Sequence, residues 1–246
     1  MDAEREGPVS SSTSALETWS GERGDLEARS AACVADAIRA RVATAGRVVL
    51  GVVGGRSVGG IYAHLARTPL PWAQVHVFLA DERLVPVDSP ESNFKLVRGD
   101  LLAPLLDSGA MPPGNAHPFP LDESRPDCGV GAYDEALRAL GGRLDVVVLS
   151  AGEDGHTASL FPDHPSVRLD ADGFVLVEGS PKPPPRRVSA SRRLLAAADL
   201  GVLVFFGEEK REALAKLRNP SIDVIGCPSK VLTSMRRGVV VTDLGA

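Results

Sequence analysis

The sequence is poor in cysteine, has no long apolar run and carries no excess of positive charge, and each shortage excludes a class of protein. The three cysteines, Cys33, Cys128 and Cys227, are far apart and form no C-x-x-C pair. An odd number at this spacing excludes a disulfide framework and suits a reducing compartment. We therefore expect a cytoplasmic protein.

No stretch approaches the roughly 18 consecutive apolar residues that a membrane span requires. Residues 1–14 are acidic and serine-rich, without the basic-then-apolar order of a signal peptide. We expect no membrane partner and interpret residues 1–14 as a disordered leader. The net charge of −5 argues against a nucleic-acid partner, so an anionic ligand would need a local cluster of cations.

Nucleotide and metal motifs are also missing. The glycine segment at residues 54–57 has neither the G-x-G-x-x-G pattern nor the lysine of a Walker loop. The five histidines form no H-E-x-x-H or similar spacing. The sequence therefore predicts no cofactor and no metal.

What the sequence does contain is an alternation of apolar strands and amphipathic helices. Its 246 residues, 43% apolar and 24% charged, have the composition of an ordinary globular protein. Strands are expected at 48–53, 75–80, 144–150, 201–206 and 238–242, with helices between them. This order predicts an α/β protein with a three-layer, Rossmann-like, mainly parallel sheet, and we expect residues 15–246 to form one domain.

Other segments are less regular. We expect a long polar loop after residue 80, a helix at 92–106 and a short strand at 174–178. The run Pro183-Pro184-Pro185 cannot enter a helix or a central strand and predicts an extended, polyproline-like loop.

The segment AGEDGHTASLFPDHP follows the strand at 144–150 and contains the best candidate for catalysis. In open α/β sheets, ligands bind just beyond the carboxyl ends of the strands, and His156 lies at such a place. A histidine there can serve as a general base. The alternative is a loop histidine that caps a backbone group, because D-G is above all a turn signal.

Two more strand ends carry polar residues. Gly54, Gly55, Arg56 and Ser57 precede a helix, where exposed N–H groups attract an oxyanion, although Ser57 could equally be only a helix cap. Asp81 and Arg83 follow the strand at 75–80. Arg83 offers a planar fork for a phosphate or carboxylate, and Asp81 could orient a base or a sugar hydroxyl. The alternative is an ion pair on a solvated loop, worth under ~1 kcal/mol.

A third cluster lies in SPKPPPRRVSAS, where Lys182, Arg186 and Arg187 stand on stiff proline backbone. In an acidic protein such a rigid basic cluster suits a small anion. A proline-stiffened surface loop, or a PxxP ligand of a partner domain, is the alternative.

Together, the glycine loop, DERLVP with a downstream S-N, DGHTASLFP and SPKPPPRR resemble the 6-phosphogluconolactonase family, in the same order from about residue 48 to 206. The resemblance implies a fold of the glucosamine-6-phosphate deaminase/ribose-phosphate isomerase type. It also implies hydrolysis of 6-phosphogluconolactone in the pentose phosphate pathway, with a phosphosugar lactone as partner. We expect a monomer.

The resemblance assigns roles to individual residues. His156 matches the histidine that activates water, and Asp81 and Arg83 match the D-E-R motif. Lys182 and Arg186 match a phosphate clamp that includes Gly54, Gly55, Arg56 and Ser57, and Gly155 belongs to the histidine loop that meets the substrate. Departures from the family pattern include Ser150 before this loop and the chain beyond Ile225.

Three other functions stay open. A glucosamine-6-phosphate deaminase-like isomerase would use Asp81 as a carboxylate base. A non-catalytic sugar-phosphate sensor would keep the fold without the chemistry, and a scaffold would act through its PxxP segment.

Overall fold

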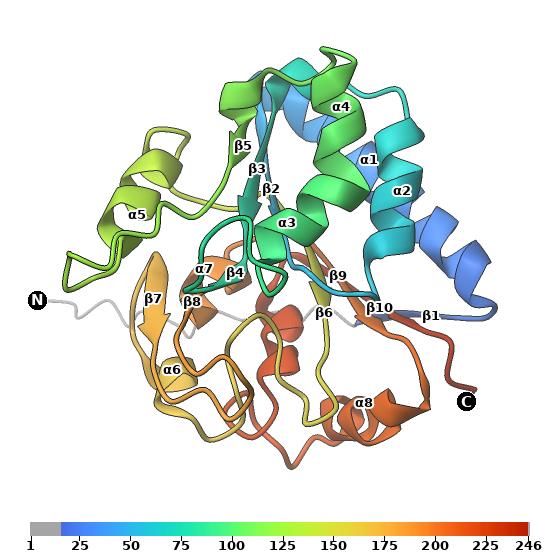
Figure 1. The fold of residues 1–246 in the computed structure, drawn as a ribbon. Coiled ribbons are helices and arrows are strands. Elements are labelled where there is room, and N and C mark those ends of the chain that lie inside the picture. Colours follow the sequence, from blue (N-terminus) through green and yellow to red (C-terminus); the bar gives the residue numbers. More distant parts are fainter. Residues whose placement is uncertain (1–15, 246) are drawn as a thin grey trace, which may run out of the picture.

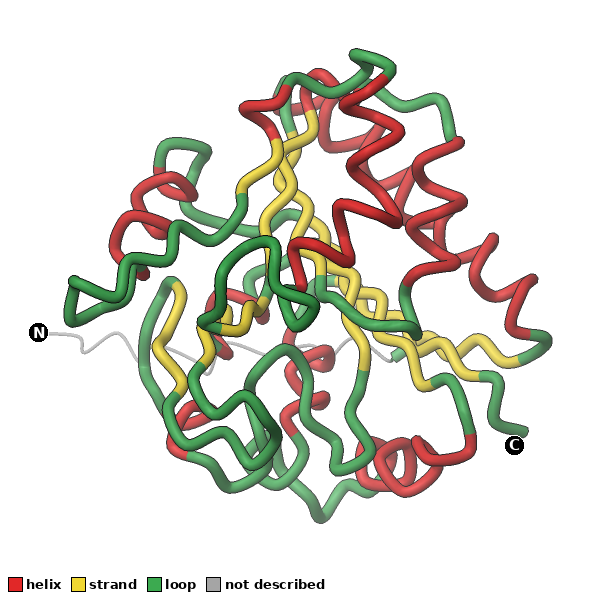
Figure 2. The backbone as a smooth tube through the Cα atoms, in the orientation of Figure 1, coloured by secondary structure: helices red, strands yellow, loops and turns green. Residues whose placement is uncertain are grey.

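The computed structural model describes residues 16–245. The leader predicted at residues 1–14 lies outside these described residues. Figure 1 shows the fold by element, and Figure 2 shows how strands run through the centre with helices around them. Within residues 16–245, no helix combines the length and the apolar character needed to cross a membrane.

The central sheet has seven strands in the order β1-β10-β9-β6-β2-β3-β5, and every neighbouring pair is parallel. Its strands are β1 (Glu17–Ser20), β2 (Val48–Val52), β3 (Val75–Leu79), β5 (Ala116–His117), β6 (Val146–Ser150), β9 (Leu200–Phe205) and β10 (Arg237–Thr242). All residues of β2 and β9 are buried. Continuous apolar runs, rather than alternating ones, are typical of parallel strands covered on both faces.

Helices cover both sides of this sheet, which confirms the predicted α/β class. In Figure 1, α1, α2, α3 and α4 lie together on one side, and α5 and α7 lie on the other. The helices are α1 (Arg23–Ala45), α2 (Gly59–Arg67), α3 (Asn93–Val97), α4 (Ala103–Asp107), α5 (Val130–Arg138), α6 (Pro165–Arg168), α7 (Arg192–Ala196) and α8 (Arg211–Arg218). The helix expected at 92–106 is interrupted by a π-helical turn at Arg98–Leu102, between α3 and α4.

A second sheet was not predicted. Its three antiparallel strands lie in the order β4-β8-β7: β4 (Asp81–Arg83), β8 (Arg187–Ala190) and β7 (Phe174–Val177). The strand at β7 was expected, but β4 falls in the segment interpreted as a polar loop, and that interpretation is wrong. Three residues are too few to show a period, and β4 exists because it pairs with β8, about a hundred residues later along the chain.

Candidate active site

A cleft of about 510 Å³ opens at the carboxyl ends of the central strands. It is lined by the segments that follow β2, β6 and β9, by β4 and by the proline loop before β8. A larger cleft of about 860 Å³ lies against α1 and the first residues of β6, β9 and β10. Its arginines are largely paired with carboxylates. In the smaller cleft, by contrast, the buried Arg83 Nε and Asn93 Oδ1 have no hydrogen-bond partner among the described residues, and this favours the smaller cleft as the site.

The loop after β6 holds His156 in a fixed orientation. Its Nδ1 lies 2.6 Å from Oδ1 of Asp154, whose same oxygen accepts the backbone N–H of His156 at 3.1 Å. An ionised carboxylate only accepts, so Nδ1 carries the proton and Nε2 of the neutral ring is left as the base. The ring packs on Phe161, with 4.7 Å between centroids, and the side chain is 16% exposed.

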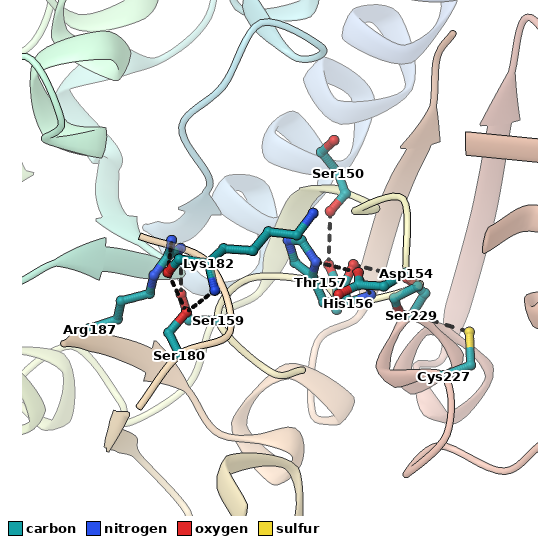
Figure 3. Close-up of polar contacts among 11 residues, drawn as sticks. Ser150, Asp154, His156, Thr157, Ser159, Ser180, Lys182, Arg187, Cys227 and Ser229 are labelled. Atoms are coloured by element: carbon teal, nitrogen blue, oxygen red, sulfur yellow. Dashed lines mark hydrogen bonds and ion pairs between the residues drawn. The ribbon is translucent and has the colours of Figure 1, made fainter. Parts of the chain in front are cut away.

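The Asp154 carboxylate is stabilised in its charged form. Burial alone would raise its pKa, but the hydrogen bond and the charge of His156, together with the charge of Lys182, lower the pKa overall. Figure 3 shows the Lys182 side chain extending from the proline loop toward His156. The His156 imidazole, which follows β6, and the Lys182 ammonium, which comes from the proline loop, thus line the same cleft.

The backbone N–H groups of the glycines in this loop are used to form the turn. Gly155 donates its N–H to Gly152 O at 3.1 Å, and Gly152 donates to His156 O at 2.8 Å. Gly155 has φ +95°, is buried, and faces Cys227, whose Sγ would lie 3.1 Å from an added Cβ. Gly155 therefore does not line the cleft as predicted, whereas Gly152 does.

The predicted residues of β4 line the cleft too. Asp81 is 5% exposed, and its Oδ2 accepts a hydrogen bond from Ser159 Oγ at 2.7 Å. Arg83 also lines the cleft, and its Nη1 donates to Glu91 O at 2.5 Å. Between them, Glu82 points away and accepts the N–H groups of Asn93 and Phe94 at the start of α3. Burial raises the pKa of Glu82, and these hydrogen bonds oppose that rise.

All four residues of the glycine loop, Gly54 to Ser57, line the cleft. Ser57 is not the helix cap: α2 begins after Val58, which makes no side-chain cap. Within residues 16–245 the Ser57 hydroxyl makes no hydrogen bond, so it is available to a ligand in the cleft. A side chain at Gly54 would overlap Asn93, which explains the need for glycine there.

The proline loop corrects one prediction. Lys182 lines the cleft, but Arg186 does not. Arg186 is directed outward, with Nε 3.3 Å from Glu178 and Nη1 3.6 Å from Glu123. Arg187 lines the cleft in its place and is 4% exposed. Successive residues of a strand point to opposite faces, and the sequence RR does not reveal which arginine points inward.

Several lining residues were missed from the sequence. Arg23 comes from the start of α1, Asn93 from the start of α3, and Glu209 and Lys210 follow β9. The rule that ligands bind at strand ends could have found the pair after β9, because the strand itself was predicted. Arg23 has no such signal. No group of three His, Cys, Asp or Glu side chains placed to hold a metal ion occurs in the part of the chain that the structure describes.

Comparison with known proteins identifies the family to which the chain belongs. The family model described as glucosamine-6-phosphate isomerases/6-phosphogluconolactonase matches residues 21–241. The chain is 36% identical to a 6-phosphogluconolactonase of Pseudomonas aeruginosa, over 81% of this chain and 83% of that protein. It is 31% identical to a 6-phosphogluconolactonase of Nostoc, over 84% of this chain and 86% of that protein.

Among solved structures, a 6-phosphogluconolactonase from Shewanella baltica superposes with a TM-score of 0.78 at 25% identity, covering 92% of this chain and 96% of that one. A monomeric glucosamine-6-phosphate deaminase superposes with a TM-score of 0.77 at 17% identity, over 92% and 97%. This likeness confirms the fold type that the sequence resemblance implied. The chain belongs to the glucosamine-6-phosphate isomerase/6-phosphogluconolactonase family.

Proposed function

We propose that this protein hydrolyses 6-phospho-D-glucono-1,5-lactone to 6-phospho-D-gluconate, with His156 as the general base. The observation that carries the proposal is the imidazole fixed by Asp154 at 2.6 Å beside the cationic Lys182 in one cleft. The names of the related proteins support the lactone as substrate.

The chemistry needs no covalent nucleophile, because a δ-lactone is an activated ester. Nε2 of His156 takes a proton from water as the water oxygen attacks C1, which contributes about 10²–10⁴ in rate. The carbonyl electrons move to oxygen, and they return as the bond from C1 to the ring oxygen breaks. His156 then gives its proton to that ring oxygen, which leaves as the C5 hydroxyl.

Charge stabilisation comes from the cations. The N–H groups of Gly152 and Gly155 are used inside the turn, so Arg83 is the group we assign to the developing oxyanion. Lys182, Arg56, Ser57 and the backbone of the glycine loop bind the phosphate. Binding energy from this remote group orients the lactone for attack. Asp81 accepts a hydrogen bond from a sugar hydroxyl.

A deaminase-like isomerase is the second candidate, because the buried Asp81 carboxylate lines the same cleft and the fold is shared with a deaminase. Two assays separate them: acid production from freshly made 6-phosphogluconolactone, corrected for spontaneous opening, and ammonia release from glucosamine 6-phosphate. We expect acceleration of the first and none of the second. Ammonia release from glucosamine 6-phosphate would favour the deaminase. Tight binding of a phosphosugar without either reaction would indicate a sugar-phosphate sensor.

Two expectations from the sequence stay predictions. We propose a cytoplasmic location, in line with three free cysteines, and a monomer. Sedimentation velocity at micromolar concentration tests the second, since a dimer would double the mass of 25.8 kDa.

A further inference from the structure

Arg187 lines the cleft, yet its hydrogen-bond donors are occupied within the protein. Its Nη2 donates to the carbonyl oxygens of Lys182 at 3.2 Å and Pro183 at 2.9 Å, and its Nε donates to Pro184 O at 3.1 Å. Nη1 lies 3.4 Å from Ser159 Oγ. A guanidinium has five N–H donors, so these four bonds leave one for a ligand. Arg187 is therefore poorly suited to be a main phosphate ligand.

The loop that Arg187 contacts has few backbone donors of its own. Its three successive prolines have no N–H groups, so they cannot donate to other parts of the backbone. The loop's own bonds are from Ser180 N to Pro185 O at 2.9 Å, from Lys182 N to Ser180 Oγ at 3.2 Å and from Ser180 Oγ to Lys182 O at 2.8 Å. The three carbonyl oxygens bound by Arg187 are consecutive, from residues 182 to 184. The planar Arg187 side chain is thus the donor to Pro183 O and Pro184 O, and it shares Lys182 O with the Ser180 hydroxyl.

The other side of Arg187 faces the remaining parts of the site. Ser159 Oγ, its weak partner, donates to Asp81 Oδ2 at 2.7 Å. The centroid of the Phe161 ring lies 5.5 Å from the guanidinium carbon of Arg187. The same ring also packs against the His156 ring. Arg187 therefore connects the proline loop to Asp81 and to the ring that supports the base.

We propose that Arg187 is a positioning residue that holds the backbone of residues 182–184 and so places the Lys182 ammonium in the cleft that His156 also lines. This inference rests on the proposed role of Lys182 in substrate binding. Because Arg187 acts through Lys182, replacing Arg187 should lower kcat/KM only slightly in a variant that already lacks the Lys182 ammonium.

The neighbouring arginine supplies a matched control. Arg186 carries the same charge one position earlier, but it is exposed and pairs with Glu178 and Glu123 on the outer surface. Arg186→Met and Arg187→Met change side-chain size and net charge equally. They differ in that only R187M removes the side-chain donor to Pro183 O and Pro184 O and one of the two donors to Lys182 O, whereas R186M removes the contact of Nη2 with Cys128 Sγ at 3.0 Å.

The test is a double-mutant cycle on kcat/KM, with each arginine variant made in the parent chain and in Lys182→Ala. We expect R187M to lower kcat/KM about 50-fold in the parent and less than about 3-fold in K182A, whereas R186M changes it less than about 3-fold in both. An equal loss from R187M in both backgrounds would show general damage to the fold and overturn the inference. Unchanged activity of R187M in the parent would overturn it too.

A second readout does not depend on activity. We expect amide hydrogen exchange at Ser180 and Lys182 to quicken at least about 10-fold in R187M and to stay unchanged in R186M. Unchanged exchange in R187M overturns the inference. If K182A alone keeps its kcat/KM, the proposed function of Lys182 fails, and amide exchange still decides what Arg187 does. Should R187M not fold, Arg187→Lys replaces it in both measurements, because an ammonium cannot reach three carbonyls in the plane of a guanidinium.

Discussion

At the scale of single residues, the site depends on how closely the imidazole of His156 fits its own loop. Asp154 fixes Nδ1, Phe161 supports one face of the ring, and Gly152 lies under the ring with no side chain of its own. The position of His156 was predictable because it follows a clear strand. Its partner Asp154 was not recognised, since D-G is equally the signature of a turn.

Gly152→Ala should displace the imidazole, because a methyl group at position 152 would occupy the place of the His156 ring. We expect kcat to fall by about 10²-fold, with a smaller change in KM, as for loss of a general base. Gly114→Ala is the control, since nothing lies within 4 Å of its added Cβ. Steady-state kinetics at equal thermal stability decide the matter. A parental kcat for Gly152→Ala would mean that the ring position does not matter.

At the scale of elements, the outer edge of the central sheet contains a histidine pair away from the cleft. His76 on β3 and His117 on β5 approach to 3.1 Å between Nδ1 and Nε2, and His117 stacks on Phe78 at 4.1 Å. Burial, and then the charge of His76, lower the pKa of His117 to about 4, while burial lowers the pKa of His76. The His117 ring is thus neutral in the folded protein near pH 6.

This pair makes stability sensitive to acid. An unfolded histidine titrates near pH 6.5, so between about pH 6.5 and about 4 the unfolded state binds more protons. The free energy of unfolding should therefore decrease as pH falls through this window, by at most about 1.4 kcal/mol per pH unit for each group. His117→Phe should flatten that slope, and His64→Gln on the exposed face of α2 should not. Urea unfolding at several pH values between about 6.5 and 4 measures this pH dependence. If the free energy of unfolding of His117→Phe falls with pH as steeply as that of the parent, His117 is not its source.

Elements also show where prediction from sequence stopped. Long apolar runs such as 144–150 identified the central strands, because burial on both faces leaves a continuous signal. Strand β4 was missed because three residues carry no period. Strand β8 follows prolines, and only its pairing with β4 and β7 identifies it. Arg186 was assigned from the family resemblance, and without this pairing the sequence does not show that Arg187 is the arginine that lines the cleft.

At the scale of the whole molecule, the first and last described strands are neighbours: β1 pairs with β10. The second sheet is tied to the first through Ala190 N, which donates to Ala80 O at 2.6 Å. We propose that residues 16–245 form one domain and predict a single calorimetric unfolding transition, with van't Hoff and calorimetric enthalpies in agreement. Two separated transitions would contradict it.

The cleft as a whole could be predicted because parallel strands end at the same edge of a sheet. Residues far apart in the sequence, such as Ser57, Arg83 and His156, were therefore expected to converge, and they line one cleft. Contributions from outside the strand ends could not be predicted. The chain beyond Ile225, which departs from the family pattern, braces the histidine loop: Ser229 N donates to Gly155 O at 3.0 Å.

The most direct test is the rate at which the parent chain and His156→Ala open fresh 6-phosphogluconolactone, each corrected for spontaneous hydrolysis and compared at equal folding. The account predicts that the parent accelerates opening, and that the variant loses about 10²–10⁴ in kcat with KM nearly unchanged, because the phosphate contacts remain. Parental turnover by His156→Ala would contradict it.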